Sequence, residues 1–244
     1  MKIFLLGAAG NAGQRILREA LARFHEITAL MRDAAKLPSS PNLRVTPGVI
    51  DKSPDLARMM VGHDVVINAA GNVADGIAFT KLVQTVIDAT TASLGEGGRL
   101  WAFCGAALLT VPGTRLMAVD LPKVPRVYET HRTNLAALQR SQLDWSMLCP
   151  GPMIASESGR STPNLRVSAD EWPMARPAYT YIFILPRLAM AFAFKRIVPE
   201  LTITYEDAAE VILDNLSKGD RFSRCRVGVA LPPGMRKHKD DVPR

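Results

Sequence analysis

The spacing of glycines near the start of the chain constrains the fold more than any other feature of the sequence. Residues 2–6 form a short apolar run of strand length, and Gly7, Gly10 and Gly13 follow in a G-x-x-G-x-x-G pattern. The next residues are apolar at helical intervals: Ile16, Leu17, Ala20, Leu21 and Phe24. A strand, a glycine turn and a helix in this order are the setting that a dinucleotide-binding fingerprint requires.

Each of the three glycines has a physical role in such a turn. Gly7 permits a tight turn, Gly10 lets the backbone approach a pyrophosphate, and Gly13 lets the helix pack closely on the strand. The free N–H groups at the start of the helix would then face the phosphates. An ordinary turn of an α/β protein is the alternative. We predict cofactor contacts along the whole segment: Gly7, Ala9, Gly10, Asn11, Ala12 and Gly13.

The residue after the second predicted strand decides between NAD and NADP. Residues 26–31 have the pattern of a strand, and Arg32 follows directly. An acidic side chain at this position binds the ribose 2′-hydroxyl, whereas a cation accommodates the 2′-phosphate of NADP. The net charge of +7 also suits an anionic ligand. We therefore expect NADP(H). Asp33 keeps NAD(H) as an alternative, and a solvated arginine is the other interpretation of Arg32.

Two later segments add candidate cofactor contacts. Residues 43–45 have the pattern of a third strand, and Asp51 is expected either to bind the adenine amino group or to cap a helix over residues 54–60. Residues 64–70 are almost continuously apolar, as in a strand buried on both faces of a parallel sheet. Ligands lie at the carboxyl ends of such strands. We expect the following residues to line the cofactor: Asn68, Ala69, Ala70 and Gly71.

The alternation of strands and helices continues along the chain. A helix is expected over residues 77–94, and a strand over 99–104 ends at Gly105. A further helix over 127–142 and a strand over 145–149 follow. This order predicts an α/β fold, a doubly wound parallel sheet with helices on both faces.

The remainder of the chain is less regular. Residues 106–125 have no periodic pattern and are expected to be a loop or short elements, and residues 156–177 are expected to be polar and irregular. The final elements are expected to be a strand over 201–205, a helix headed by Glu206 and Asp207, and a strand over 226–230. We predict a single domain over residues 1–231. Residues 152–202 contribute a small substrate lobe to it, and residues 232–244 form a loose polar tail.

Residues 179–194 form a strongly apolar segment. It has 16 residues and is interrupted by Pro186. A spanning helix needs about 20 residues, so we expect no transmembrane span. A cover over the substrate pocket, a dimer surface and an interfacial membrane anchor are the alternatives. The protein is accordingly expected to be a monomer or a homodimer.

Composition narrows the remaining classes of function. The sequence has no run of Lys and Arg interleaved with aromatic residues, so we expect no nucleic-acid partner. Cys104, Cys149 and Cys225 lie far apart without metal-ligand spacing, which predicts buried thiols, a reducing compartment and no metal site. The glycines from Gly7 onward interrupt the apolar amino terminus, so no secretion signal is expected and the predicted location is the cytoplasm.

Six stretches match the pattern of a known group: GAAGNAG at 7–13, ALMRDAAKL at 29–37, GHDVVINAAG at 62–71, CGAALLTVPG at 104–113, LQRSQLDWSMLCPGPMI at 138–154 and ITYEDAAEVILDNL at 203–216. On these motifs the chain resembles the atypical short-chain dehydrogenases/reductases over residues 1–229. Within that group it is most similar to NAD(P)H-binding proteins described as NADH-flavin reductase-like, relatives of biliverdin reductase B and of NmrA-like regulators. The resemblance implies a Rossmann-type domain, a bound NADP(H) and a small C-terminal lobe over the nicotinamide.

The chain departs from this group at the residues that supply the proton. Short-chain reductases usually carry a Ser, a Tyr and a Lys there, whereas this chain has Ala106 in place of the Ser and His131 in place of the Lys. Tyr128 precedes His131 by three residues, so one helical turn puts both on one face. We expect Tyr128 and His131 to position a substrate or to relay a proton, or else to be packing or surface residues.

The missing Ser limits the chemistry. Reducing a carbonyl to an alcohol needs a proton donor at the oxygen, whereas a flavin or quinone delocalises the charge that hydride brings. The first hypothesis is therefore an NADPH-dependent reductase of a small flavin- or quinone-like acceptor, with Gly105 flanking the nicotinamide. The alternative is a non-catalytic NADP(H)-binding redox sensor that acts through a protein partner. An epimerase or dehydratase is a third hypothesis, which the small lobe and the missing Tyr–Lys pair disfavour.

Overall fold

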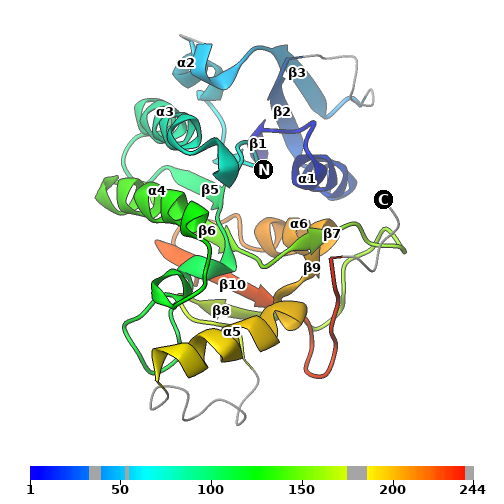
Figure 1. The fold of residues 1–244 in the computed structure, drawn as a ribbon. Coiled ribbons are helices and arrows are strands. Elements are labelled where there is room, and N and C mark those ends of the chain that lie inside the picture. Colours follow the sequence, from blue (N-terminus) through cyan, green and yellow to red (C-terminus); the bar gives the residue numbers. More distant parts are fainter. Residues whose placement is uncertain (33–39, 53–54, 175–185, 240–244) are drawn as a thin grey trace.

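A single mixed sheet organises the chain in the computed structural model, which describes residues 1–32, 40–52, 55–174 and 186–239 (Figure 1). The eight strands follow the spatial order β3-β2-β1-β4-β5-β6-β10-β8. Their bounds are β1 Lys2–Leu6, β2 Glu26–Met31, β3 Leu43–Pro47, β4 Val65–Asn68, β5 Arg99–Phe103, β6 Asp144–Cys149, β8 Arg166–Ala169 and β10 Cys225–Ala230. Every pairing is parallel except that of β8 with β10. The predicted doubly wound parallel sheet is confirmed.

Helices cover both faces of the sheet (Figure 1). Their bounds are α1 Asn11–Ala22, α2 Leu56–Met60, α3 Ile77–Leu94, α4 Glu129–Arg140, α5 Arg187–Leu201 and α6 Tyr205–Leu213. Alternate residues of β1 divide between two cores, because successive strand side chains point to opposite faces. Ile3 and Leu5 pack in a core that includes residues of α1 and α6, whereas Phe4 and Leu6 pack in a core with α2, α3, α4 and α5.

Short elements connect the sheet to its helices. Single turns of 3₁₀ helix lie at Ile50–Lys52, Val73–Asp75, Ala106–Leu108, Ala118–Asp120 and Arg126–Tyr128. A second, two-stranded parallel sheet joins β7 (Met153–Ile154) to β9 (Ile203–Thr204). The region over 106–125 thus consists of short elements, as predicted from its irregular sequence.

Four expectations about local structure need correction. Phe24 does not share the apolar face of α1, since it lies beyond the helix with a left-handed φ of +58° and is 84% exposed. Asp51 does not cap α2, because it lies in the preceding 3₁₀ turn and Asp55 is the N-cap. Residues 156–177 include the regular strand β8, which pairs with β10 at the sheet edge. The strand over 201–205 is shortened to two residues.

The early end of β9 has a local cause. Thr204 Oγ1 accepts a hydrogen bond from Asp207 N (3.0 Å), and the Asp207 carboxylate accepts one from Thr204 N (2.8 Å). This reciprocal pair is a capping box, which satisfies two backbone N–H groups at the start of α6. Thr204 is therefore both the last residue of β9 and the N-cap of α6, so the strand does not continue beyond it.

A buried arginine fixes the amino-end edge of the sheet. The Arg99 side chain is fully buried at the start of β5 and donates to Asp144 Oδ1 (3.1 Å), Asp220 Oδ2 (3.0 Å) and Asn215 O (2.9 Å). Burial lowers the pKa of Arg99 against the opposing effect of the two carboxylates. The network connects β5 to β6 and to the loop after α6. It lies at the opposite edge of the sheet from the carboxyl ends of β1, β4 and β5.

The apolar segment over 179–194 divides at Pro186. Residues 179–185 lie outside the described residues, and the remainder forms the first half of α5. Phe194 packs against the core, whereas Leu188 and Phe192 are 60% and 61% exposed. Among the described residues, no helix combines the length and apolar character that crossing a membrane requires. Contact with a membrane interface or a second copy stays a prediction.

The chain after β10 returns along α5. Lys237 N donates to Pro199 O (3.0 Å), and Lys237 Nζ donates to Thr162 Oγ1 (3.2 Å). These contacts lie within the predicted tail, whose last residues, 240–244, are outside the described residues.

Candidate functional site

The carboxyl ends of the central strands meet along one edge of the sheet. β1 pairs with β2 on one side and with β4 on the other, so the direction in which the chain adds strands reverses between β1 and β4. Ligands of doubly wound sheets bind outside the strand ends at such a switch point. Gly7 follows β1, residues 69–71 follow β4 and Gly105 follows β5. The fold therefore brings these predicted cofactor contacts to one edge.

The turn after β1 leaves no room for side chains at two of its glycines. Gly7 has a left-handed φ of +80°, and a Cβ there would lie 2.6 Å from the backbone carbon of Ala69. A Cβ at Gly13 would overlap the carbonyl oxygen of Gly7 and lie 2.7 Å from the Gly7 carbonyl carbon. Helix α1 consequently approaches β1 as closely as the glycine spacing predicts.

The start of α1 has the properties of a phosphate-binding turn. Gly10 is the N-cap and provides no side-chain cap, and the first intrahelical hydrogen bond runs from Gln14 N to Gly10 O (2.9 Å). The N–H groups of Asn11, Ala12 and Gly13 precede that bond, where helices commonly bind anions. The first turn of α1 contains no acidic residue that would repel an anion. Gln14 Nε2 donates to Ala9 O (2.9 Å) and holds the turn in place.

Arg32, the predicted contact for a 2′-phosphate, lies at the carboxyl end of β2. Arg32 is exposed and directly follows β2, the neighbour of β1, so it lies at the same edge as Gly7. Asp51 is exposed in the 3₁₀ turn that follows β3, one strand further out. Asp33 lies outside the described residues. Contact of Arg32 with a 2′-phosphate and of Asp51 with adenine remain predictions.

The end of β4 is shaped by a buried amide. Asn68 is 2% exposed, and its Oδ1 accepts a hydrogen bond from Ala70 N (3.1 Å). Ala69 and Ala70 are half-buried, and Gly71 has a left-handed φ of +112°. A Cβ at Gly71 would overlap the Phe79 ring. The missing side chain of Gly71 therefore leaves room for the Phe79 ring.

Tyr128 and His131 come together at the end of β5. Tyr128 is in the 3₁₀ turn before α4, and its ring stacks on the His131 ring with centroids 6.3 Å apart and planes 9° apart. A Cβ at Gly105 would lie 3.5 Å from His131 Nε2 and 3.8 Å from Tyr128 Cδ1. His131 is 6% exposed, and no described group bonds to its Nδ1. The pair therefore adjoins the predicted nicotinamide position.

Sequence reasoning missed a thiol pair beside this histidine. Cys104 and Cys149 directly continue the aligned pair Phe103 and Leu148 of β5 and β6, and both are buried. Burial raises the pKa of Cys104, but hydrogen bonding with Cys149 and the charge of His131 outweigh it and lower the pKa to about 5. Burial and the neighbouring thiolate raise the pKa of Cys149. The sequence held one signal, a cysteine at the end of two consecutive strands.

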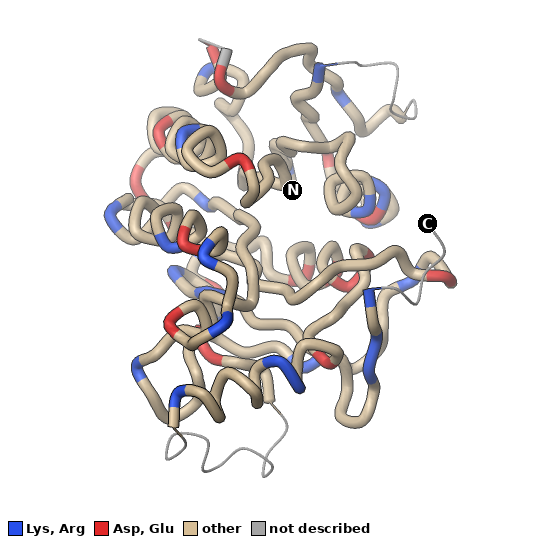
Figure 2. Tube along the Cα trace, in the orientation of Figure 1, with Lys and Arg blue, Asp and Glu red and all other residues tan. Residues whose placement is uncertain are grey.

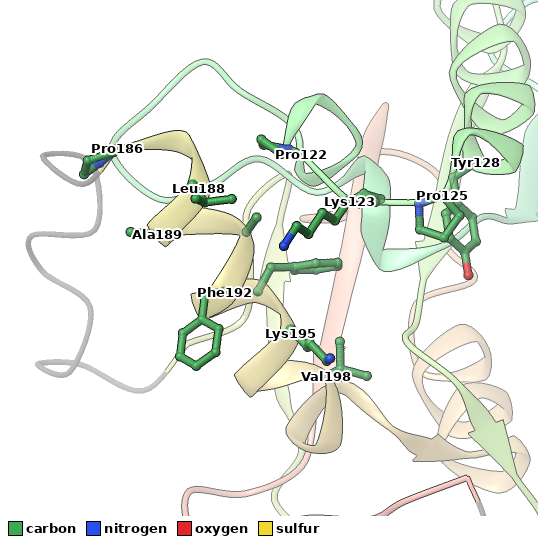
Figure 3. A pocket seen from close by; sticks show the side chains of 13 residues that line it. Pro122, Lys123, Pro125, Tyr128, Pro186, Leu188, Ala189, Phe192, Lys195 and Val198 are labelled. Atoms are coloured by element: carbon green, nitrogen blue, oxygen red, sulfur yellow. The ribbon is translucent and has the colours of Figure 1, made fainter.

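A cavity of about 920 Å³ opens beside Tyr128 (Figure 3). One wall is the chain over 122–128 and the other is α5. Most of its lining is apolar, including Val124, Leu188 and Phe192. The volume is that of a pocket for a drug-sized molecule. Within the described ranges, no three His, Cys, Asp or Glu side chains gather as metal ligands would.

Comparison with known proteins places this geometry in context. A model of the NAD(P)H-binding family matches residues 7–173. The chain is 26% identical over 240 residues to the uncharacterized protein YwnB of Bacillus subtilis (strain 168), with 91% of this chain and 97% of YwnB aligned. The structure of a candidate NADH-flavin reductase from Streptococcus pneumoniae aligns with 95% of this chain and 100% of its own, with a TM-score of 0.70 and 20% identity.

A further solved structure was determined with a nucleotide. It is a wide-type short-chain dehydrogenase/reductase from Veillonella parvula in complex with NADP, which aligns over 99% of both chains with a TM-score of 0.69 and 17% identity. At these identities, the two solved structures establish a shared fold.

Proposed function

We propose that this chain, which belongs to the NAD(P)H-binding family, is an oxidoreductase that uses NADPH to reduce a small flavin- or quinone-like acceptor. The family match confirms the resemblance inferred from the sequence motifs. The observation that carries the proposal is the meeting of the glycine turn, Gly105, the Tyr128–His131 stack and a large apolar cavity at one edge of the sheet. The NADP complex of a protein with the same fold supports the choice of cofactor.

Each part of the cofactor has a group suited to it. The N–H groups at the start of α1 would bind the pyrophosphate, and Arg32 would bind the 2′-phosphate through its guanidinium. Asp51 would accept from the adenine amino group. Residues 69–71 and Gly105, which follow β4 and β5, would flank the nicotinamide ring. When bound, the nicotinamide supplies a hydride.

The groups near Gly105 favour an acceptor that can be reduced without a strong proton donor beside its reacting atom. Ala106 is buried in the 3₁₀ turn after β5 and has no hydroxyl to offer at the position of the usual serine. His131 would hold a proton beside Gly105, and Tyr128 would orient a flat ring placed against it. A flavin or quinone suits this arrangement, because its ring delocalises the charge that an alkoxide would concentrate on one oxygen.

Oxidation of NADPH by the purified protein tests the proposal. The panel of acceptors is FMN, riboflavin, a quinone, biliverdin and an aromatic aldehyde, with NADPH consumption followed by its absorbance. Steady turnover with flavins or quinones and slow turnover with the aldehyde are expected. Tight NADPH binding without turnover on any acceptor would contradict the proposal and favour the redox-sensor alternative.

A further inference from the structure

The cavity beside Tyr128 has two positive charges in an otherwise apolar wall. Lys123 projects from the chain over 122–128, and Lys195 projects from α5 on the opposite side (Figure 3). The other lining residues are aliphatic, aromatic or proline side chains, apart from the Tyr128 hydroxyl, and none of the described lining residues is acidic. The cavity is therefore lined mainly by apolar side chains, and its two cationic side chains come from two separate segments of the chain.

Neither lysine is neutralised within the described part of the chain. Arg132, by contrast, is paired with acidic groups: its Nη2 lies 2.7 Å from Asp120 Oδ1, and its Nε lies 2.9 Å from Glu129 Oε2. Lys123 and Lys195 form no such pair with any described residue. In Figure 2, α5 has basic residues at its start and in its second half, with uncharged chain between them. The charges at the cavity are thus available to a ligand.

The cavity and the predicted reaction centre share one residue, Tyr128. Tyr128 lines the cavity, and its ring also stacks on His131 and lies 3.8 Å from a Cβ built at Gly105. A flat molecule in the cavity that rests against Tyr128 would have one end near Gly105 and the other toward α5. The distant end would then meet the lysine ammonium groups.

We propose that the acceptor is a flat apolar molecule with one anionic substituent, a phosphate or a carboxylate, and that Lys123 and Lys195 bind the anion and select for it. This inference rests on the proposed function and narrows its substrate class. Two ammonium groups at an apolar site attract an anion and exclude a cationic analogue. Both are positioning residues for the substrate, since they contact the part of it that does not react.

FMN and riboflavin provide a matched pair of probes, because they share the reacting ring and differ by one phosphate. Their dissociation constants are measured without NADPH by quenching of flavin fluorescence, and their kcat/KM values with NADPH. The unmodified protein is expected to prefer FMN about tenfold or more, and Lys123→Gln and Lys195→Gln are each expected to reduce that ratio about 3–10-fold. The double variant should lose most of the preference.

Lys218→Gln is the matched control. Lys218 is exposed in the loop after α6, which adjoins the Arg99 network at the opposite edge of the sheet, and the ratio should stay unchanged. Equal binding of FMN and riboflavin, failure of FMN to bind, or equal losses for both flavins in the lysine variants would overturn the inference. NADPH oxidation with no preference for FMN rejects this inference alone. FMN-selective binding without NADPH oxidation rejects the proposed function alone.

Discussion

Alanine at Gly10 and alanine at Gly13 perturb the same turn in different ways. Gly10 has an ordinary φ of −76°, and a Cβ there would meet only the Gly7 carbonyl oxygen, at 3.3 Å. A Cβ at Gly13 would collide with the backbone of Gly7 and lie 2.9 Å from Ala8 Cα. We therefore expect Gly10→Ala to affect the cofactor and Gly13→Ala to affect both the cofactor and the fold.

The magnitudes follow from those contacts. Overpacking at Gly13 should cost about 1–3 kcal/mol of unfolding free energy, which for a chain of this size lowers Tm by roughly 2–12 °C. Gly10→Ala should change the unfolding free energy by no more than about 1 kcal/mol, because the loss of a glycine N-cap is offset by a less flexible unfolded chain. The methyl group that Gly10→Ala introduces would lie where the pyrophosphate of the cofactor approaches. Loss of a charge-assisted hydrogen bond, about 1.5–3 kcal/mol, would weaken NADPH binding about 10–150-fold.

Thermal unfolding and NADPH fluorescence titration measure the two effects separately. The expected pattern is a near-normal Tm with weak binding for Gly10→Ala, and a lowered Tm with weak binding for Gly13→Ala. Normal NADPH affinity in Gly10→Ala would refute the placement of the pyrophosphate at the start of α1. An unchanged Tm in Gly13→Ala would refute the packing argument.

Three further predictions concern the cofactor, the thiol pair and the sheet. Arg32→Ala should weaken NADPH binding by about 1–3 kcal/mol in titrations and leave NADH binding nearly unchanged; equal losses would contradict a 2′-phosphate contact. Burial opposes ionisation of Cys104, yet its pKa is lowered to about 5, so its ultraviolet thiolate absorbance should disappear as the pH falls through that value. His131→Ala should raise this pKa, and an unmoved titration would exclude the histidine as a cause. Since the ordinary pKa of a thiol is 9.0, the stability that Cys104 contributes is fully present above that pH and lost toward pH 5. Arg99→Met leaves two largely buried carboxylates without a charged partner and should lower the unfolding free energy, measured by urea denaturation, by about 3–5 kcal/mol. A change below about 1 kcal/mol would argue against a stabilising role of the network.

Local patterns were sufficient to predict the nucleotide-binding half of the fold. β1, β2 and α3 have the predicted bounds, because each is a run of apolar residues with clear periodicity between glycines or polar residues. Phe24 was misplaced because an apolar residue at helical spacing does not reveal that the helix has already ended. Whether a residue continues a periodic face depends on where the helix ends, and the spacing of apolar residues alone does not reveal that position.

The elements that sequence reasoning missed depend on distant partners. β8 is a half-exposed strand whose polar and apolar residues alternate over only four positions, and it pairs with β10 about 60 residues later in the chain. Cys104 and Cys149 become neighbours through strand register, and His131 joins them from α4. The cavity walls likewise come from the chain over 122–128 and from α5. Such groupings are set by tertiary packing, so a local pattern does not show which residues become neighbours.

The most direct test of the account is a single-turnover reaction with NADPH deuterated at C4 of the nicotinamide. The protein is loaded with each of the two deuterated stereoisomers in turn and mixed with FMN, and the loss of NADPH absorbance is timed. We expect the bound NADPH to be oxidised, and the reaction to be slowed by deuterium on one face of the ring and not on the other, because the nicotinamide is held in one orientation. Failure of bound NADPH to react with FMN or a quinone, or equal rates for both stereoisomers and unlabelled NADPH, would contradict hydride transfer at this site.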